Sequence, residues 1–188
     1  MTLRKALDWI LSIAAAIVFV LVFEAEIAKP YRIPSSSMEP TLDCAKPSEG
    51  CVGSFNDRVI AARIVYDFES PRRGQIVVFK APPAASVCGP RDGGTTFVKR
   101  LIGLPGDRVV ERDGTIFVNG TRLDEPYVSP SERDTESGSW VVPAGRYFFL
   151  GDNRAHSCDS RTWGTVPRRA LIGPVVLTYF PLDRIGIH

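Results

Sequence analysis

The chain has 188 residues, a length that suits one domain or one domain with a small insertion. Its 23 Lys and Arg residues nearly balance 21 Asp and Glu, and it shows no basic stripe with interleaved aromatics and no zinc-finger spacing. Nucleic acid is therefore not an expected partner. Plentiful proline (15) and glycine (16) favour many short strands and turns over long helices.

The first segment of note is an apolar run from Trp9 to Phe23 that contains no charge. It is near the lower limit of the roughly 17–25 residues that span a bilayer as a helix. A cleavable signal peptide would need small residues at a cleavage site after the run, but charged residues follow it. A buried core helix is a second alternative. We predict an uncleaved transmembrane helix within residues 1–28, with Pro30 ending the helix.

The charges around this run predict its orientation. Arg4 and Lys5 precede it, while Glu24 and Glu26 follow it. Positive residues are retained on the cytoplasmic side of a membrane. We therefore place the N-terminus in the cytoplasm and expect residues 29–188 to form an extracytoplasmic domain.

A serine cluster follows the apolar run, in the segment from Pro34 to Leu42. Three consecutive hydroxyls between prolines are an ordinary turn composition. If it stood alone, a solvated linker beside the membrane would be the plainer interpretation.

The four cysteines contain no C-x-x-C pair, which makes a zinc ribbon a poor interpretation, and no metal site is predicted. Outside the cytoplasm, disulfides are possible. Cys44 and Cys51 enclose a short loop and are the best candidate pair. Cys88 and Cys158 form either a second pair or two free thiols.

The rest of the chain reads as short strands separated by turns and loops. Asp113-Gly114 and Asn119-Gly120 flank a four-residue β run, which is a strong hairpin signal. Asn119-Gly120-Thr121 also matches a glycosylation acceptor, but the turn explains these residues without glycan. We predict a mainly β, antiparallel domain with no second long helix. The expected strands are 57–68, 75–80, 96–102, 108–112, 115–118, 140–142, 147–150, 170–173 and 175–180, with loops at 81–94 and 123–138.

A serine hydroxyl is a poor nucleophile unless an adjacent base takes its proton. One candidate base is His156, oriented by Asp152 or Asp159 in a histidine triad, but no G-x-S-x-G elbow accompanies it. His188 is a weaker candidate.

Lys99 is the other candidate base. An ammonium must be desolvated before it can accept a proton at neutral pH, and Lys99 is surrounded by apolar residues. Side chains alternate along a strand, so Phe97, Lys99 and Leu101 share one face and Arg100 faces the other way. The structural alternative is an edge-strand lysine that discourages aggregation.

Three motifs together resemble the bacterial type I signal peptidases, the membrane-anchored serine/lysine proteases. Residues 35–41, Ser-Ser-Ser-Met-Glu-Pro-Thr, match the family's Ser-x-Ser-Met-x-Pro-Thr. The Lys99-Arg100 strand and the Gly151–Arg161 loop resemble its lysine and Gly-Asp-Asn-Arg motifs. Residues 73–79 look like its Arg-Gly-Asp-Ile-Val-Val-Phe strand, with Gln75 in place of the usual acid.

The resemblance implies a role for each matching residue. Ser37 would be the nucleophile and Lys99 the general base. The Ser35 hydroxyl and the Ser37 backbone N–H would form the oxyanion hole. Ser157 would hydrogen-bond the lysine and orient it, with Asp159 and Arg161 as a supporting ion pair.

The resemblance also implies the reaction and the partners. The substrate would be a preprotein with small residues at the first and third positions before the cut, hydrolysed through an acyl-enzyme without any cofactor. Ile33, Met38 and Val98 are near enough in sequence to the dyad to be candidate walls of the substrate pocket. The lipid bilayer would be the other partner, and the bacterial cell membrane the location.

Three alternatives remain at this point. A repressor-type self-cleaving Ser/Lys peptidase acts in the cytoplasm and typically carries a DNA-binding module, which the apolar run and the composition argue against. A conjugation-system peptidase of the same superfamily is closer and is poorly excluded by sequence. An inactive, membrane-anchored β domain that binds partners is the third, and the intact Ser37 and Lys99 pair weighs against it.

Overall fold

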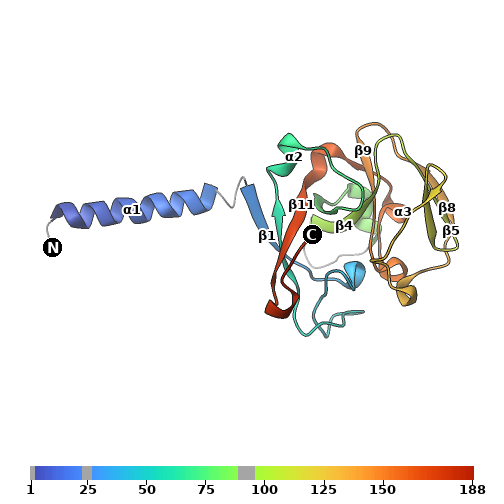
Figure 1. Ribbon diagram of the computed structural model, residues 1–188, viewed down its shortest axis with the longest axis horizontal. Helices are drawn as coiled ribbons and strands as arrows, with labels where there is room; N and C mark the ends of the chain where they lie inside the picture. The colour runs from blue at the N-terminus through green and yellow to red at the C-terminus, as the bar shows by residue number, and fades with distance from the viewer. Residues whose placement is uncertain (1–2, 23–26, 89–95) are drawn as a thin grey trace.

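The computed structural model describes residues 3–22, 27–88 and 96–188. Helix α1 (Leu3–Val22) projects away from a β domain, with its apolar side chains exposed, such as Trp9 and Val18 (Figure 1). Within the described residues, no helix combines the length and the mean hydropathy of a membrane span. Glu24 and Glu26, used above to orient the predicted anchor, lie outside the described residues.

The larger of the two sheets that the described residues form has the strand order β1-β2-β11-β3-β4-β9-β10, and β12 pairs with β11. All of these pairs are antiparallel, which confirms the predicted mainly β, antiparallel class. Its strands are β1 (Ala28–Arg32), β2 (Arg58–Ala62), β3 (Ile76–Lys80), β4 (Thr96–Gly103), β9 (Arg146–Leu150), β10 (Val166–Pro167), β11 (Leu171–Phe180) and β12 (Gly186–Ile187).

The smaller sheet has the order β7-β6-β5-β8, built from β5 (Arg108–Arg112), β6 (Thr115–Val118), β7 (Thr121–Arg122) and β8 (Gly138–Val141). The two predicted hairpins join β5 to β6 and β6 to β7. In each turn both central residues have positive φ: Asp113 at 46° with Gly114 at 70°, and Asn119 at 52° with Gly120 at 84°. That geometry matches the twist of the flanking strands, which is why Asp-Gly and Asn-Gly pairs are found there.

Strand β4 runs from the larger sheet toward the smaller one and ends at Gly103. A Cβ at Gly103 would lie 2.8 Å from Val142 Cγ2 and 2.9 Å from both Phe148 Cβ and Val109 Cγ2. Only a glycine lets the chain pass this closely between the two sheets.

One predicted strand is wrong in its second half. Residues 57–68 form β2 only as far as Ala62, and Val65–Phe68 is a short helix, α2. The reason is tertiary: β11 pairs with β2 from Phe180 to Val175 and then pairs with β3 from Pro174 onward. Because β2 loses its partner there, the chain turns. The predicted 81–94 loop begins as a 3-10 turn, η3 (Pro83–Cys88), and residues 89–94 lie outside the described part.

The larger sheet contributes to three hydrophobic clusters, and one of them fixes the serine segment. Met38 and Leu42 are 1% and 0% exposed and pack with Ile33, Val59 and Val78. Burying two large apolar side chains contributes about 1.5–3 kcal/mol each. The other two clusters centre on Phe79, Leu101, Phe149 and Trp163, and on Ile102, Ile116, Val142 and Phe148.

Candidate active site

The serine segment forms a short 3-10 turn, η2 (Ser36–Met38), that follows β1. The Glu39 backbone N–H donates to the Ser36 carbonyl at 3.0 Å, and the Leu42 N–H donates to the Met38 carbonyl at 2.9 Å. With Met38 and Leu42 in the core, the turn holds Ser37 at 4% exposure. The Ser35 and Ser37 hydroxyl oxygens lie 3.3 Å apart. The segment is thus a packed turn rather than a solvated linker.

Lys99 lies on β4, which is an interior strand between β3 and β9. It is paired with Val77 in register and is 4% exposed. The pairing with β9 begins at Arg100, so it is the burial of Lys99 that argues against the alternative of an exposed edge lysine that discourages aggregation. Burial disfavours the charged form of an amine, which is the condition that a lysine base requires.

A cavity of about 580 Å³ brings the serine segment and the lysine strand together. Ser35, Ser37 and Lys99 all line it. The three predicted pocket residues, Ile33, Met38 and Val98, line it too. The remaining lining residues are Tyr31, Arg32, Pro34, Ser48, Asn56, Cys88, Thr96, Phe97 and Cys158. Hydroxyl, amine and apolar wall thus share one concave site.

The Gly-Asp-Asn-Arg loop after β9 packs directly behind the serine turn. The Asn153 N–H donates to the Ser37 carbonyl at 3.2 Å. A Cβ at Gly151 would collide with that same carbonyl oxygen and with Ser157 Oγ, so the close approach requires glycine. The Gly151 N–H in turn donates to Asp159 Oδ2 at 3.1 Å.

Asp159 and Arg161 form the ion pair that the resemblance implies, with Arg161 Nε 2.9 Å from Asp159 Oδ1. Asp159 also caps α3 (Ser160–Trp163), since its side chain accepts from the Arg161 backbone N–H. Arg161 Nη2 donates to the Arg154 carbonyl at 2.7 Å. The pair therefore fixes both ends of the loop behind the serine turn.

The expected hydrogen bond between Ser157 and Lys99 is not made in this structure. Ser157 Oγ is buried and has no hydrogen-bond partner among the described residues. Its hydroxyl packs against Gly151 instead. The sequence could not predict the orientation of the Ser157 hydroxyl, because that orientation depends on how the loop after β9 packs against the distant serine turn.

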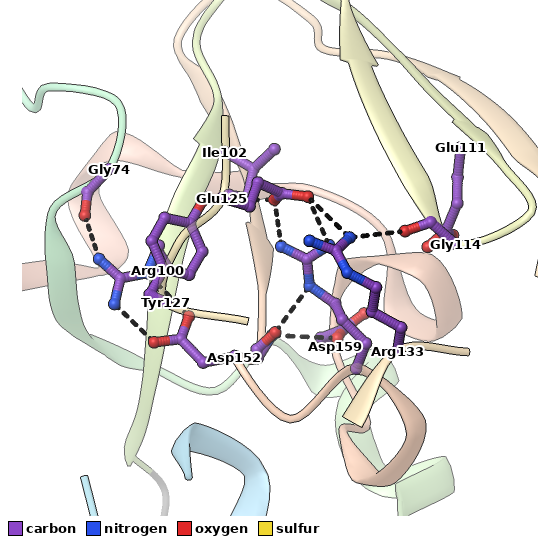
Figure 2. A network of polar contacts seen from close by, with 12 residues as sticks. Gly74, Arg100, Ile102, Glu111, Gly114, Glu125, Tyr127, Arg133, Asp152 and Asp159 are labelled. Carbon is purple, nitrogen blue, oxygen red and sulfur yellow. Dashed lines mark hydrogen bonds and ion pairs between the residues drawn. The ribbon is translucent and has the colours of Figure 1, made fainter. Parts of the chain in front are cut away.

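Sequence reasoning missed an ion pair that links all three motifs. Arg100 donates from Nε to Asp152 Oδ1 at 2.7 Å and from Nη2 to Asp152 Oδ2 at 2.5 Å. The Thr41 hydroxyl donates to Asp152 Oδ2 at 2.5 Å, which adds the serine segment. Figure 2 shows Arg100 between Asp152 and the Gly74 carbonyl. The Arg100 guanidinium carbon lies 3.8 Å from the centre of the Tyr127 ring. The available signal was strand alternation, which turns Arg100 away from Lys99.

A second buried network extends toward the smaller sheet (Figure 2). Arg154 is 1% exposed and pairs with Glu125, while its Nε donates to the Gly151 carbonyl at 3.0 Å. Arg161 Nη1 pairs with Asp134 and lies 3.4 Å from Glu111 Oε1. Glu111 and Glu125 come from segments that the sequence presented only as strand and loop. In the folded chain these two carboxylates lie beside Arg154 and Arg161 of the loop after β9.

Glu111 is the most perturbed carboxyl of this network. Burial raises its pKa to about 7; the Arg161 guanidinium opposes that rise and the Asp134 carboxylate adds to it. One oxygen, Oε2, is buried and has no hydrogen-bond partner among the described residues. Ionising Glu111 in the folded protein is therefore costly.

We expect this group to make stability depend on pH. Between about pH 4.5 and 7 the unfolded chain releases the Glu111 proton and the folded chain retains it, so folding stability falls as pH rises. Glu111→Gln removes this dependence. The melting temperature of the unmodified protein, relative to that of the variant, should fall across this range in thermal scans at constant ionic strength.

Asp107→Asn serves as the control for that measurement. Hydrogen bonds from the Leu104 N–H and from Asn119, together with Arg73, outweigh burial and lower the Asp107 pKa below 3.8. Its contribution changes only at lower pH, so its difference curve should be flat from pH 4.5 to 7. A flat curve for Glu111→Gln as well would contradict the prediction.

The structure joins Cys44 to Cys51 and Cys88 to Cys158 in disulfides. The second bond ties η3 to the loop that carries Ser157, and both of its cysteines line the cavity. Within the described residues, Glu39, Cys44 and Cys51 are the one group spaced to hold a metal ion. Disulfide sulfurs offer no thiolate, so this group is unsuited to a metal.

The histidines lie elsewhere. His156 is largely exposed, and its Nδ1 lies 3.1 Å from Asn153 Oδ1 and 3.5 Å from Glu132. His188 Nε2 lies 2.8 Å from the Thr178 hydroxyl. Neither is among the described residues that line the cavity. Asp152, which would orient His156 in a histidine triad, is paired with Arg100 instead.

Several known proteins resemble this chain in sequence over most of its length. A probable signal peptidase I-2 of Synechocystis sp. is 39% identical over 176 residues, covering 94% of this chain and 74% of that protein. Signal peptidase I of Leptolyngbya laminosa is 38% identical over 180 residues, covering 96% and 82%. Signal peptidase I of Bacillus licheniformis is 31% identical over 188 residues, covering 95% and 90%. Residues 6–180 match the family described as "Signal peptidase, peptidase S26", and the chain belongs to that family.

Proposed function

We propose that this chain is a serine endopeptidase that removes N-terminal signal peptides from preproteins. The observation that carries the proposal is the shared cavity, which the Ser35 segment and the buried Ser37 and Lys99 all line. A nucleophile, a desolvated amine and an oxyanion donor are the groups that acyl transfer needs. The relatives named signal peptidase I agree with this activity.

In the proposed mechanism, the neutral Lys99 amine takes the proton of the Ser37 hydroxyl as Oγ attacks the scissile carbonyl carbon. The Ser35 hydroxyl and the Ser37 N–H donate to the oxyanion as it forms. The Lys99 ammonium then gives its proton to the leaving amine, and an acyl-enzyme remains on Ser37. Water then attacks the ester carbonyl while Lys99 takes a proton from that water, and Lys99 passes this proton to Ser37 Oγ as the ester C–O bond breaks, which restores both groups.

Ser157, Asp159 and Arg161 are proposed as positioning residues. The Asp159–Arg161 pair holds the backbone of Gly151, which lies between Ser37 and Ser157. Because the Ser157 hydroxyl has no hydrogen-bond partner among the described residues, it is left able to accept a hydrogen bond from the lysine during the reaction, which is the role we propose for it.

We propose that the substrate carries small residues at the first and third positions before the cut. Ile33, Met38 and Val98 supply apolar walls to the cavity that Ser37 and Lys99 also line, which suits small apolar side chains.

The test is to incubate the purified protein with a preprotein that has alanine at both positions and to sequence the new N-terminus. We expect a single cut directly after the alanine at the first position. Replacing this alanine by tryptophan should prevent the cut. A cut at unrelated positions, or an equal rate for both preproteins, would contradict the assignment.

We propose that residues 1–28 anchor the domain and that residues 29–188 form the peptidase on the far side of a bacterial cell membrane, with the N-terminus cytoplasmic. Three features support this: the uncharged run from Trp9 to Phe23, the position of Lys5 before it, and the exposure of apolar side chains along α1. The anchor would hold the site where signal peptides emerge and raise their local concentration.

Deleting residues 1–28 should leave a soluble domain that still cleaves a soluble peptide substrate, because α1 contributes no residue to the cavity. Its activity on preproteins in vesicles should fall more than its activity on the peptide. The two rates are compared in full-length and truncated protein. An inert but folded truncated domain would mean that the anchor does more than tether.

A further inference from the structure

Glu39 is a buried carboxylate directly after Met38, and neither the proposed mechanism nor the matched motif uses it. It is 5% exposed. Its Oε1 accepts from the Cys44 N–H and from the Val52 N–H, both at 3.2 Å. Across the described part of the chain it makes no ion pair. Because a buried carboxylate is costly unless it is hydrogen-bonded, these two N–H groups are what makes its burial tolerable.

The two donors lie where a disulfide-closed loop begins and ends: Cys44 is its first residue, and Val52 directly follows its last residue, Cys51. Cys44 and Cys51 are disulfide-bonded, so the loop between them cannot open. A pair of backbone bonds also closes it, from the Gly53 N–H to the Cys44 carbonyl at 3.0 Å and from the Lys46 N–H to the Gly53 carbonyl at 3.0 Å. Glu39 therefore bonds to a cross-linked frame.

At its other end, Glu39 is continuous with the nucleophile's turn. Its backbone N–H closes η2 by donating to the Ser36 carbonyl at 3.0 Å. A displacement of Glu39 would therefore move Ser37, which lies between these two residues in the chain.

We infer that Glu39 is a positioning residue, which sets the place of Ser37 by fastening its turn to the Cys44–Cys51 loop. This inference rests on the proposed function, since it assigns Glu39 an effect on the Ser37 reaction. An error of about 1 Å in the position of a reacting atom lowers a rate by roughly 10²-fold.

Two variants test the inference. Glu39→Met keeps the length of the side chain but removes the acceptor, and it should lower kcat by about thirtyfold to a hundredfold with KM nearly unchanged. Glu39→Gln retains a carbonyl oxygen with two lone pairs, so it should keep kcat within about threefold. Rates are measured in single turnovers, well below the melting temperature of each variant.

Asp107→Leu is the matched control. Asp107 is another buried carboxylate that accepts from a backbone N–H, that of Leu104 at 2.6 Å, but it lies in the turn between β4 and β5. This variant should lower the melting temperature without lowering kcat at the assay temperature. A purely structural Glu39 would behave in the same way.

A double-mutant cycle tests whether the disulfide loop is the intermediary. Glu39→Met and the pair Cys44→Ala with Cys51→Ala should each lower kcat, and together they should lower it little more than either does alone. Independent effects that multiply would overturn the loop's part in the inference.

Retention of full kcat by Glu39→Met would overturn the role of Glu39. That result is distinguishable from failure of the proposed function, because the same preparation would still cleave preproteins and would still require Ser37. Loss of kcat in both Glu39→Met and Glu39→Gln would also contradict the inference, since the glutamine oxygen reproduces the acceptor.

Discussion

Replacing Ser37 by Ala is expected to abolish preprotein cleavage while leaving the protein folded. The Ser37 hydroxyl is the only part of the side chain that changes, and the turn around it is held by Met38, Leu42 and backbone hydrogen bonds. Loss of the nucleophile in a serine protease lowers kcat by about 10⁶-fold. The measurement is cleavage of a preprotein by enzyme in excess, together with the melting temperature.

The neighbouring serines sharpen this prediction, because all three hydroxyls lie in one segment. Ser35→Ala removes the proposed oxyanion donor and should lower kcat by about 10²–10³-fold. Ser36→Ala removes only a 3.4 Å hydrogen bond to the Glu49 carbonyl and should retain most activity. The expected order of damage is thus Ser37, Ser35, Ser36. Retained activity in pure Ser37→Ala protein would refute the dyad.

Replacing Lys99 by Arg is the second prediction with a very large effect. The substitution keeps a long, positively charged side chain, but a guanidinium cannot release its proton in a protein. If Lys99 only stabilised negative charge, the Arg variant would work in part. If Lys99 is the general base, arginine cannot take its place because it cannot accept the Ser37 proton. We therefore expect Lys99→Arg to be as inactive as Lys99→Ala.

The control for Lys99 is Lys80→Arg, which changes an exposed lysine at the end of the adjacent strand β3. It should leave activity and its pH dependence unchanged. An active Lys99→Arg enzyme would argue against proton abstraction by this lysine.

Buried ion pairs link the segments that form the site. The Arg100–Asp152 pair is buried, and Thr41 completes it from the serine segment. Breaking a buried pair by removing one partner costs about 3–5 kcal/mol, because it leaves an uncompensated charge. The three motifs are therefore held in one relative position, which a network of exposed charges could not achieve.

The two hairpin turns and the candidate catalytic residues could be predicted from the amino-acid sequence alone. The Asp113-Gly114 and Asn119-Gly120 turns follow from residues that tolerate positive φ, so their geometry depends on nothing distant. The serine segment, Lys99 and the Gly151–Arg161 loop were also recognisable, because acyl transfer needs particular residue types in a characteristic order.

Which of these groups share a site, and what holds them there, depends on how distant segments pack. Whether Lys99 was exposed or buried depended on what packs over its strand, and the helix at Val65–Phe68 depended on where β11 changes partner. The Arg100–Asp152 pair and the orientation of Ser157 join segments far apart in the chain. Burial and pairing are properties of packed surfaces, and the alternation of residues along one strand does not contain them.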